Sequence, residues 1–425
     1  MRKMGGAVPG CKLAGRVLLQ IVLLATLAAC APSQVARHTA DVATGSPDTH
    51  AGTARKQVHR TWAFPADGIT FSNRMTGARL NGVERLGEDH YAVTISPESL
   101  PINPSPWYGF SITARQATTV AVEFRYRHGR QRYRPKLSTD GTHWRTASNG
   151  EFAKGRDGRY TLTVAVGASP LQVFAQPPWG PSDFEHWESG LQSAHDVHAD
   201  IIGRSVQGRP LRMLRFGNPD AKDVVLVIGR QHPPEITGSH ALMGFVDRLL
   251  SDTALAREFR SRTWVLVVPL MNPDGVVEGH WRGNADGKDI NRDWGTFTEP
   301  ETRAVRDAMT RQIDAAGRRL AFAIDFHSTW SDVFYTVKEA PSRQPGGVLR
   351  RWIDAMQAQY PGRIREKANA AKGTVFKNWA FRRYHAPTVT YEVGDKTSNE
   401  QIDDLAGFAA ERLMQILLDD RGDTR

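Results

Sequence analysis

Four short, almost continuously apolar segments constrain the fold of the second half of this chain. They are residues 224–229 (VVLVIG), 264–270 (WVLVVPL), 320–324 (LAFAI) and 388–391 (TVTY). Runs of this kind suit strands that are buried on both faces. Helical stretches lie between them, and strands that alternate with helices are typical of an α/β sheet. We therefore expect an α/β domain built on a mixed sheet over residues 183–420.

Each apolar run leads into polar or titratable residues. The four runs lead in turn into His232, Asn272, Asp325 with His327, and Glu392. Ligands of open α/β sheets bind at the carboxyl ends of the strands. We therefore expect these side chains to converge on one site.

His232 and Glu235 form a His-x-x-Glu motif after the first run. At this spacing an imidazole nitrogen and a carboxylate oxygen can face one metal ion, and both suit zinc. A second, distant histidine would complete three ligands and leave one position open for water. Alone the motif is common, because proline and glutamate also suit an ordinary helix start. The polar residues at the other strand ends favour the metal site.

In combination these motifs resemble the zinc carboxypeptidases of the M14 class, over most of residues 203–394. Residues 203–211 (GRSVQGRPL) resemble the opening strand of that family. Three further segments resemble the substrate-binding stretch of that family: NPDG at 272–275, WR at 281–282 and GKDINRDW at 287–294. The resemblance implies a hydrolase that holds one Zn²⁺ and uses water to release C-terminal residues from peptides.

The resemblance also implies roles for single residues. His232, Glu235 and His327 stand where the family has its zinc ligands, and Glu392 stands where it has its general base. Asp289 falls where an outer carboxylate orients the first ligand histidine and fixes its tautomer. An aspartate at a turn is an equally good interpretation of that position.

Four further positions concern the substrate. Arg282 would polarise the scissile carbonyl, and Asn291 with Arg292 would hold the C-terminal carboxylate of the peptide. Lys377 lies near the family's specificity pocket and would face an acidic C-terminal side chain; a surface lysine is the alternative. The tyrosine that digestive-type members carry before the general base has no match at its spacing.

Residues 60–178 predict an all-β sandwich that precedes the catalytic domain. Alternating runs at 118–126 (TTVAVEFRY) and 160–166 (YTLTVAV) are typical of half-buried strands. The proline-rich stretch 176–181 marks the boundary. This region resembles the β-sandwich of cytosolic-type carboxypeptidases, and we expect Trp107 and Trp144 to be packing residues rather than a ligand platform.

Residues 1–30 resemble a bacterial lipoprotein signal peptide. Several basic residues precede a short apolar core at 17–29, which ends in Leu-Ala-Ala-Cys with Cys30. We expect a lipid on Cys30, a flexible tether at 31–59 and a place on the outer face of a membrane in the cell envelope. An ordinary signal peptide with an incidental Cys30 is the alternative. Removal of Cys11 would leave no pair for an internal disulfide.

The net charge of +10 is spread along the chain rather than clustered. It indicates a solvated basic surface near anionic envelope polymers, and nucleic-acid binding is not expected.

Two other functions fit parts of the pattern. A zinc amidase or deacylase acting on cell-wall stem peptides would use the same ligands, and a stem peptide also carries a free carboxylate. A catalytically inactive binding module fits less well, because the three ligands and Glu392 occur together.

Overall fold

The computed structural model describes residues 55–344 and 346–422. The predicted signal segment 1–30 with Cys30, and the part of the predicted tether up to residue 54, lie outside the described residues. Within the described ranges, no helix has both the length and the apolar character needed to cross a membrane.

Residues 61–174 form two β-sheets. One has six strands in the order β1 (Thr61–Phe64), β2 (Ile69–Ser72), β5 (Gly109–Ala114), β11 (Leu171–Phe174), β7 (Lys136–Ser138) and β8 (Arg145–Thr146). The other has five, in the order β3 (Gly82–Gly87), β4 (His90–Ile95), β6 (Thr118–Tyr126), β10 (Tyr160–Val166) and β9 (Phe152–Lys154). The two strands that the sequence predicts here, β6 and β10, have the expected bounds and pair antiparallel along their length.

The two sheets enclose one apolar core. Phe71 on β2 and Tyr91 on β4 come from different sheets, and their ring centroids lie 5.2 Å apart. Trp107 is buried in this core and Trp144 packs against it. Both tryptophans are thus the packing residues that the sequence predicts.

The third sheet has eight strands and carries the predicted α/β fold. Its order is β12 (His198–Arg204), β13 (Pro210–Gly217), β15 (Thr263–Val268), β14 (Asp223–Gly229), β16 (Arg319–Thr329), β19 (Thr388–Gly394), β17 (Val333–Val337) and β18 (Arg365–Asn369). The four predicted apolar runs are the parallel strands β15, β14, β16 and β19 in its centre. Antiparallel pairing joins β13 to β15 and β17 to β19, so the sheet is mixed.

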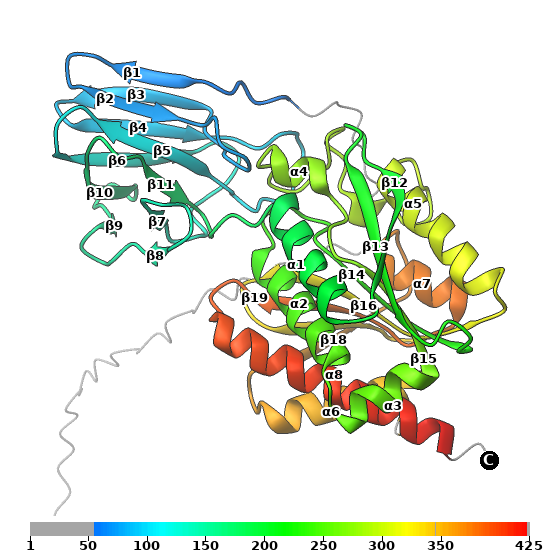
Figure 1. Ribbon diagram of the computed structural model, residues 1–425. Helices are drawn as coiled ribbons and strands as arrows, with labels where there is room; N and C mark the ends of the chain where they lie inside the picture. Colours follow the sequence, from blue (N-terminus) through cyan, green and yellow to red (C-terminus); the bar gives the residue numbers. More distant parts are fainter. Residues whose placement is uncertain (1–54, 345, 423–425) are drawn as a thin grey trace, which may run out of the picture. The chain divides into compact units, whose positions relative to one another are not determined.

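Side chains that alternate along the central strands fill two cores, one on each face of the sheet. On one face, Val225 and Val227 pack with helices α2 (Ile236–Leu250), α3 (Ala254–Arg262), α6 (Val348–Gln359) and α8 (Asn399–Gly422) (Figure 1). On the other, Val224 and Leu226 pack with α5 (Pro300–Met309) and α7 (Phe376–Tyr384). Burial on both faces explains why these strands are apolar throughout.

Short elements connect this framework. They are α1 (Pro181–Ala194), which follows the proline-rich stretch, α4 (Pro273–Val277), the 3₁₀ turns Ile290–Arg292 and Pro341–Arg343, and the π-helical turn Thr310–Asp314.

Four strand predictions were wrong in their bounds. The run at 264–270 ends at Val268, because Pro269 has no N–H group to continue the sheet. The strands β16 and β19 continue past their apolar runs, because each is hydrogen-bonded to neighbours up to its end. Residues 203–211 are not one strand: they form the end of β12, a turn at Gly208 with φ of 83°, and the start of β13.

Candidate metal centre

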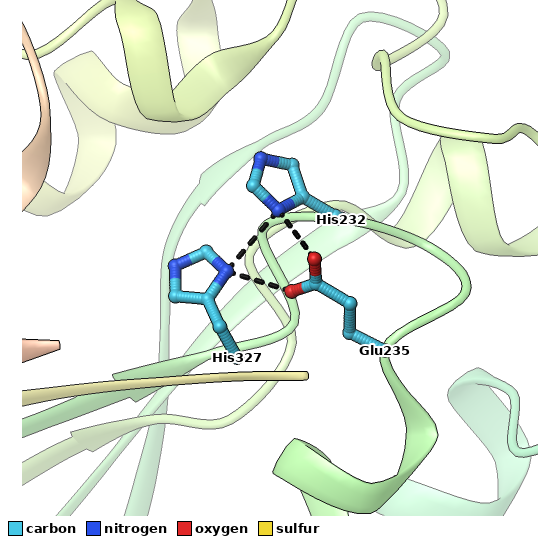
Figure 2. Close-up of side chains that lie close together, drawn as sticks. All are labelled: His232, Glu235 and His327. Carbon is cyan, nitrogen blue, oxygen red and sulfur yellow. Dashed lines mark hydrogen bonds and ion pairs between the residues drawn. The ribbon is translucent and has the colours of Figure 1, made fainter. Parts of the chain in front are cut away.

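His232, Glu235 and His327 turn their side chains toward one point (Figure 2). His232 Nδ1 lies 2.9 Å from Glu235 Oε1, and His327 Nδ1 lies 2.7 Å from Glu235 Oε2. The two Nδ1 atoms are 3.1 Å apart. All three residues are buried. Two imidazole nitrogens and one carboxylate, all facing inward, fit the ligand set of a zinc ion.

Three different elements bring these ligands together. His232 lies in the turn between β14 and α2, Glu235 is the N-cap of α2, and His327 lies within β16. The helix approaches the strand closely at Gly238, where a Cβ atom would lie 2.5 Å from the carbonyl oxygen of His327. Ser328 Oγ accepts the N–H of Gly238 at 2.8 Å and fixes this approach. Glycine is therefore required at position 238.

Asp289 lies against the outer nitrogen of the first ligand. Its Oδ1 is 3.0 Å from His232 Nε2, and Arg282 Nε donates to its Oδ2 at 2.7 Å. A proton on Nε2 leaves Nδ1 free to bind metal. Burial raises the pKa of Asp289, but the charges of Arg282 and His232 outweigh burial and hold that pKa well below its usual range. Asp289 also caps the 3₁₀ turn by accepting the N–H of Asn291. It is therefore both a partner of the ligand histidine and an aspartate at a turn, the two interpretations that the sequence allows.

The outer nitrogen of the other ligand histidine also meets a carboxylate, that of Asp325, to which the sequence motifs assign no separate role. Asp325 Oδ2 lies 2.9 Å from His327 Nε2 and accepts Gln231 Nε2 at 2.8 Å. Trp294 Nε1 in turn donates to Gln231 Oε1 at 2.8 Å. The spacing of two residues within one strand places Asp325 and His327 on the same face of the sheet. That spacing is the signal in the sequence that could have indicated Asp325 as the partner of His327.

Glu392 lies on β19 directly beside the third ligand, because its Cα pairs with that of His327 across the parallel strands. Its neighbours Tyr391 and Val393 point into the helix-covered core, so Glu392 faces the other way. Its Oε2 is buried and has no hydrogen-bond partner among the described residues. Burial, and then the negative charge of Glu235, raise the pKa of Glu392 to about 7.

Asn291 and Arg292 lie in the same 3₁₀ turn next to the ligands. Asn291 Nδ2 is 3.2 Å from His327 Nε2, and its Oδ1 accepts the N–H of Phe376 at 3.0 Å. Arg292 is partly exposed, and its Nη1 donates to the carbonyl oxygen of Asn291 at 3.0 Å. The bond to Phe376 therefore fixes the amide of Asn291 next to His327, while the guanidinium of Arg292 stays accessible.

Lys377 lies in the first turn of α7, one residue after the N–H that bonds Asn291. Only 4% of its surface is exposed, which excludes the surface-lysine alternative. Its Nζ donates to Asn378 Oδ1 at 2.7 Å, and burial lowers its pKa to about 8.

Buried ligands at the carboxyl ends of parallel strands, with a carboxylate beside them that is not itself a ligand, define a mononuclear zinc centre on an α/β sheet. Residues 185–412 match the zinc carboxypeptidase family, Peptidase_M14. The chain belongs to this family.

Among its relatives is Cytosolic carboxypeptidase 6 of Mus musculus, which is 25% identical over 315 residues, covering 67% of this chain and 58% of that protein. The chain thus matches little more than half the length of this relative. An uncharacterised protein of Zymomonas mobilis is 24% identical over 360 residues, covering 80% of this chain and 91% of that one.

Two solved bacterial structures share the fold. A putative carboxypeptidase A from Shewanella denitrificans aligns with a TM-score of 0.70 at 20% identity, covering 82% of this chain and 99% of the other. A metallo-carboxypeptidase from Pseudomonas aeruginosa, solved in complex with (2-guanidinoethylmercapto)succinic acid, gives a TM-score of 0.68 at 20% identity over 82% and 98%. Both alignments extend beyond residues 185–412, so they include part of the first two sheets.

Proposed function

We propose that this protein is a metallocarboxypeptidase that removes single residues from the C-terminus of peptides. The observation that carries the proposal is the place of Glu392, a buried carboxylate beside the three ligands that is not bound to any of them. A general base needs this position and a pKa near the working pH. Membership of the zinc carboxypeptidase family supports the same activity.

His232, Glu235 and His327 would hold the zinc ion, which would supply Lewis acidity and make water more acidic. Glu392 takes the proton of the attacking water and passes a proton to the leaving amine. Asp289 accepts a hydrogen bond from Nε of Arg282. The Nη groups of Arg282 can then donate to the carbonyl oxygen as negative charge develops there. Asn291 and Arg292 bind the terminal carboxylate, for which a planar guanidinium is well suited.

A peptide pool with all C-terminal residues, digested with and without a chelator and read by mass spectrometry, tests the proposal. We expect loss of single C-terminal residues that stops when zinc is removed. The Glu392→Gln variant, loaded with zinc, should lose about 10²–10⁴-fold in kcat, the usual contribution of a general base. Full activity of this variant would contradict the mechanism. Cleavage of internal amide bonds or of amides in cell-wall stem peptides would instead favour the amidase. No turnover of any substrate would favour the binding module.

We also propose that the enzyme prefers an acidic C-terminal residue, because Lys377 is a buried cation next to the turn that carries Asn291 and Arg292. Peptides that differ only in a terminal Glu, Phe or Lys test this preference. Lys377→Ala should lower kcat/KM for the Glu peptide by about 10–100-fold, the value of one hydrogen bond to a charged group. Lys372→Ala, which changes an exposed lysine of the same segment, is the control. Equal rates on the three peptides would refute the preference.

The place of the protein in the cell is a proposal from sequence alone. We propose that Cys30 carries a lipid that holds the protein to an envelope membrane. Cys30→Ser should abolish incorporation of labelled palmitate and release the protein into the soluble fraction. Unchanged fractionation of this variant would argue for an ordinary signal peptide.

A further inference from the structure

We infer that Glu98, a residue of the N-terminal domain, is a positioning residue for Arg282 and thereby makes this domain part of the catalytic apparatus. The inference rests on the proposed function only in the role given to Arg282. Glu98 lies just after β4, far from the zinc ligands in the sequence.

Glu98 binds three consecutive N–H groups in the segment that carries Arg282. Its Oε2 accepts the N–H of Trp281 at 2.8 Å, and its Oε1 accepts the N–H of Arg282 at 2.9 Å and of Gly283 at 2.7 Å. The first of these bonds joins residues 183 positions apart in the sequence. Because the N–H groups of Arg282 and Gly283 are both bonded, the backbone of Arg282 is fixed on both sides of its Cα.

The side chain before Arg282 anchors the same segment in the N-terminal core. Trp281 is fully buried among residues of the two N-terminal sheets, and its Nε1 donates to the carbonyl oxygen of Trp107 at 2.9 Å. A Cβ atom at Gly129 would lie 2.8 Å from the Trp281 ring, so the loop after β6 packs tightly against it. Ser99 Oγ adds a bond to the carbonyl oxygen of Gly287 at 3.3 Å.

Glu98 is an anion in this place. Burial raises its pKa, but the basic groups His280 and Arg79 and the bonded N–H groups outweigh burial and hold the pKa below its ordinary value. Hydrogen bonds to an ionised acceptor are roughly twice as strong as neutral ones. A buried carboxylate without such partners would be costly, so the segment 281–283 and Glu98 hold each other in one arrangement.

The position of this segment determines where the guanidinium of Arg282 lies. Arg282 bonds Asp289, and Asp289 bonds the ligand His232. A shift of the 281–283 backbone therefore moves the guanidinium of Arg282, which faces the scissile carbonyl in the proposed mechanism. The contact between Asp289 and His232 stays in place. A misplacement of about 1 Å can cost about a hundredfold in rate.

Glu98→Gln tests the inference, because the amide keeps the size of the side chain but has only one oxygen and presents its NH₂ to backbone donors. We expect kcat to fall by about 10–100-fold, with KM nearly unchanged and zinc content intact. The matched control is Glu123→Gln, which changes another buried glutamate of the same domain, paired with Arg125 and Arg159. The control should lose stability without losing kcat.

A double-mutant cycle separates positioning from general damage. In an Arg282→Ala background, Glu98→Gln should cost no further kcat, whereas a purely structural role would lower kcat in both backgrounds. Glu98→Asp keeps the charge but is shorter; it should fold and show an intermediate loss. Additive losses in the cycle, or full kcat in Glu98→Gln, would overturn the inference.

Hydrogen exchange of the amides of 281–283 in the zinc-free protein gives a readout that needs no activity. Exchange should be roughly tenfold faster or more in Glu98→Gln and unchanged in Glu123→Gln. If the wild-type protein cleaves no peptide but these amides still lose protection in Glu98→Gln, the proposed function fails and the positioning stands. If cleavage is normal and protection is unchanged, the positioning fails alone.

Discussion

At the scale of single residues, the ligand histidines are oriented by carboxylates on their outer nitrogens. His232 meets Asp289 and His327 meets Asp325, at 3.0 and 2.9 Å. Such partners fix the tautomer so that Nδ1 faces the metal, and they make the imidazole a stronger ligand. The two contacts are made to different histidines, so neither can replace the other.

Asp325→Asn should lower zinc affinity by about 10–100-fold, because an amide neither fixes the histidine tautomer nor supplies a negative charge. Competition with a chromophoric chelator at neutral pH measures the change. Glu188→Gln is the control. Glu188 is a buried carboxylate on α1 that pairs with Arg212 on β13 and contacts none of the ligands. Equal zinc affinities of wild type and Asp325→Asn would contradict the role of this contact.

Much of the centre could be predicted because it depends on order along the chain. His232, Glu235, His327 and Glu392 each follow an apolar run of the sequence, so pattern and resemblance identify them. Glu98 could not be found in this way, because its partners lie 183 positions away and only the packing of one domain against the other brings them together.

At the scale of elements, two strands carry residues of the candidate site within their length rather than after it. β16 includes His327 and β19 includes Glu392, paired across the sheet. The sequence predicts shorter strands because polar residues usually end an apolar run. Hydrogen bonds from both neighbours override that tendency here, since backbone pairing does not depend on the side chain.

The start of α5 contains a buried acid whose protonation affects folding. Glu301 accepts the N–H of Val206 at 3.3 Å and Asn284 Nδ2 at 3.2 Å. Burial raises its pKa to about 7. The folded state therefore binds this proton more tightly than the unfolded state, and the stabilisation is present in full below the unfolded pKa and is lost as pH rises through about 7.

Glu301→Gln should remove this pH dependence, because the amide stays neutral. The free energy of unfolding of the wild type should fall by about 3 kcal/mol between about pH 5 and pH 8 from this group, and that of the variant should fall by correspondingly less. Urea titrations of the zinc-free protein across this range measure both. Glu258→Gln, an exposed acid on α3, should behave as the wild type. A variant whose stability declines as steeply as the wild type's would show that Glu301 is not the titrating group.

At the scale of the whole molecule, the N-terminal sheets and the eight-stranded sheet share buried contacts. Trp281 and Ile236, which belong to the zinc-binding region by sequence, pack in the N-terminal core. Arg132 adds an ion pair with Asp395, with Nε to Oδ2 at 2.8 Å. Regions joined by buried apolar contacts of this kind are expected to unfold together.

Trp281→Ala should therefore destabilise both regions at once, by about 3–5 kcal/mol, the usual cost of removing a buried tryptophan. Calorimetry should show one transition for the wild type and a lower Tm, or two separated transitions, for the variant. Trp330→Ala, at a tryptophan that is 46% exposed, should leave Tm nearly unchanged. If Trp281→Ala lowers Tm no more than this control, the two regions fold independently.

The burial of Trp281 also limits how the chain can be shortened for expression. A fragment that starts after the N-terminal sheets would place this indole ring in water, next to the exposed side chain of Ile236, and would leave the N–H groups of residues 281–283 without their acceptor. Such a surface favours aggregation. Any expressed fragment meant for enzymology should therefore keep residues 55–178 attached, even though every zinc ligand lies outside them.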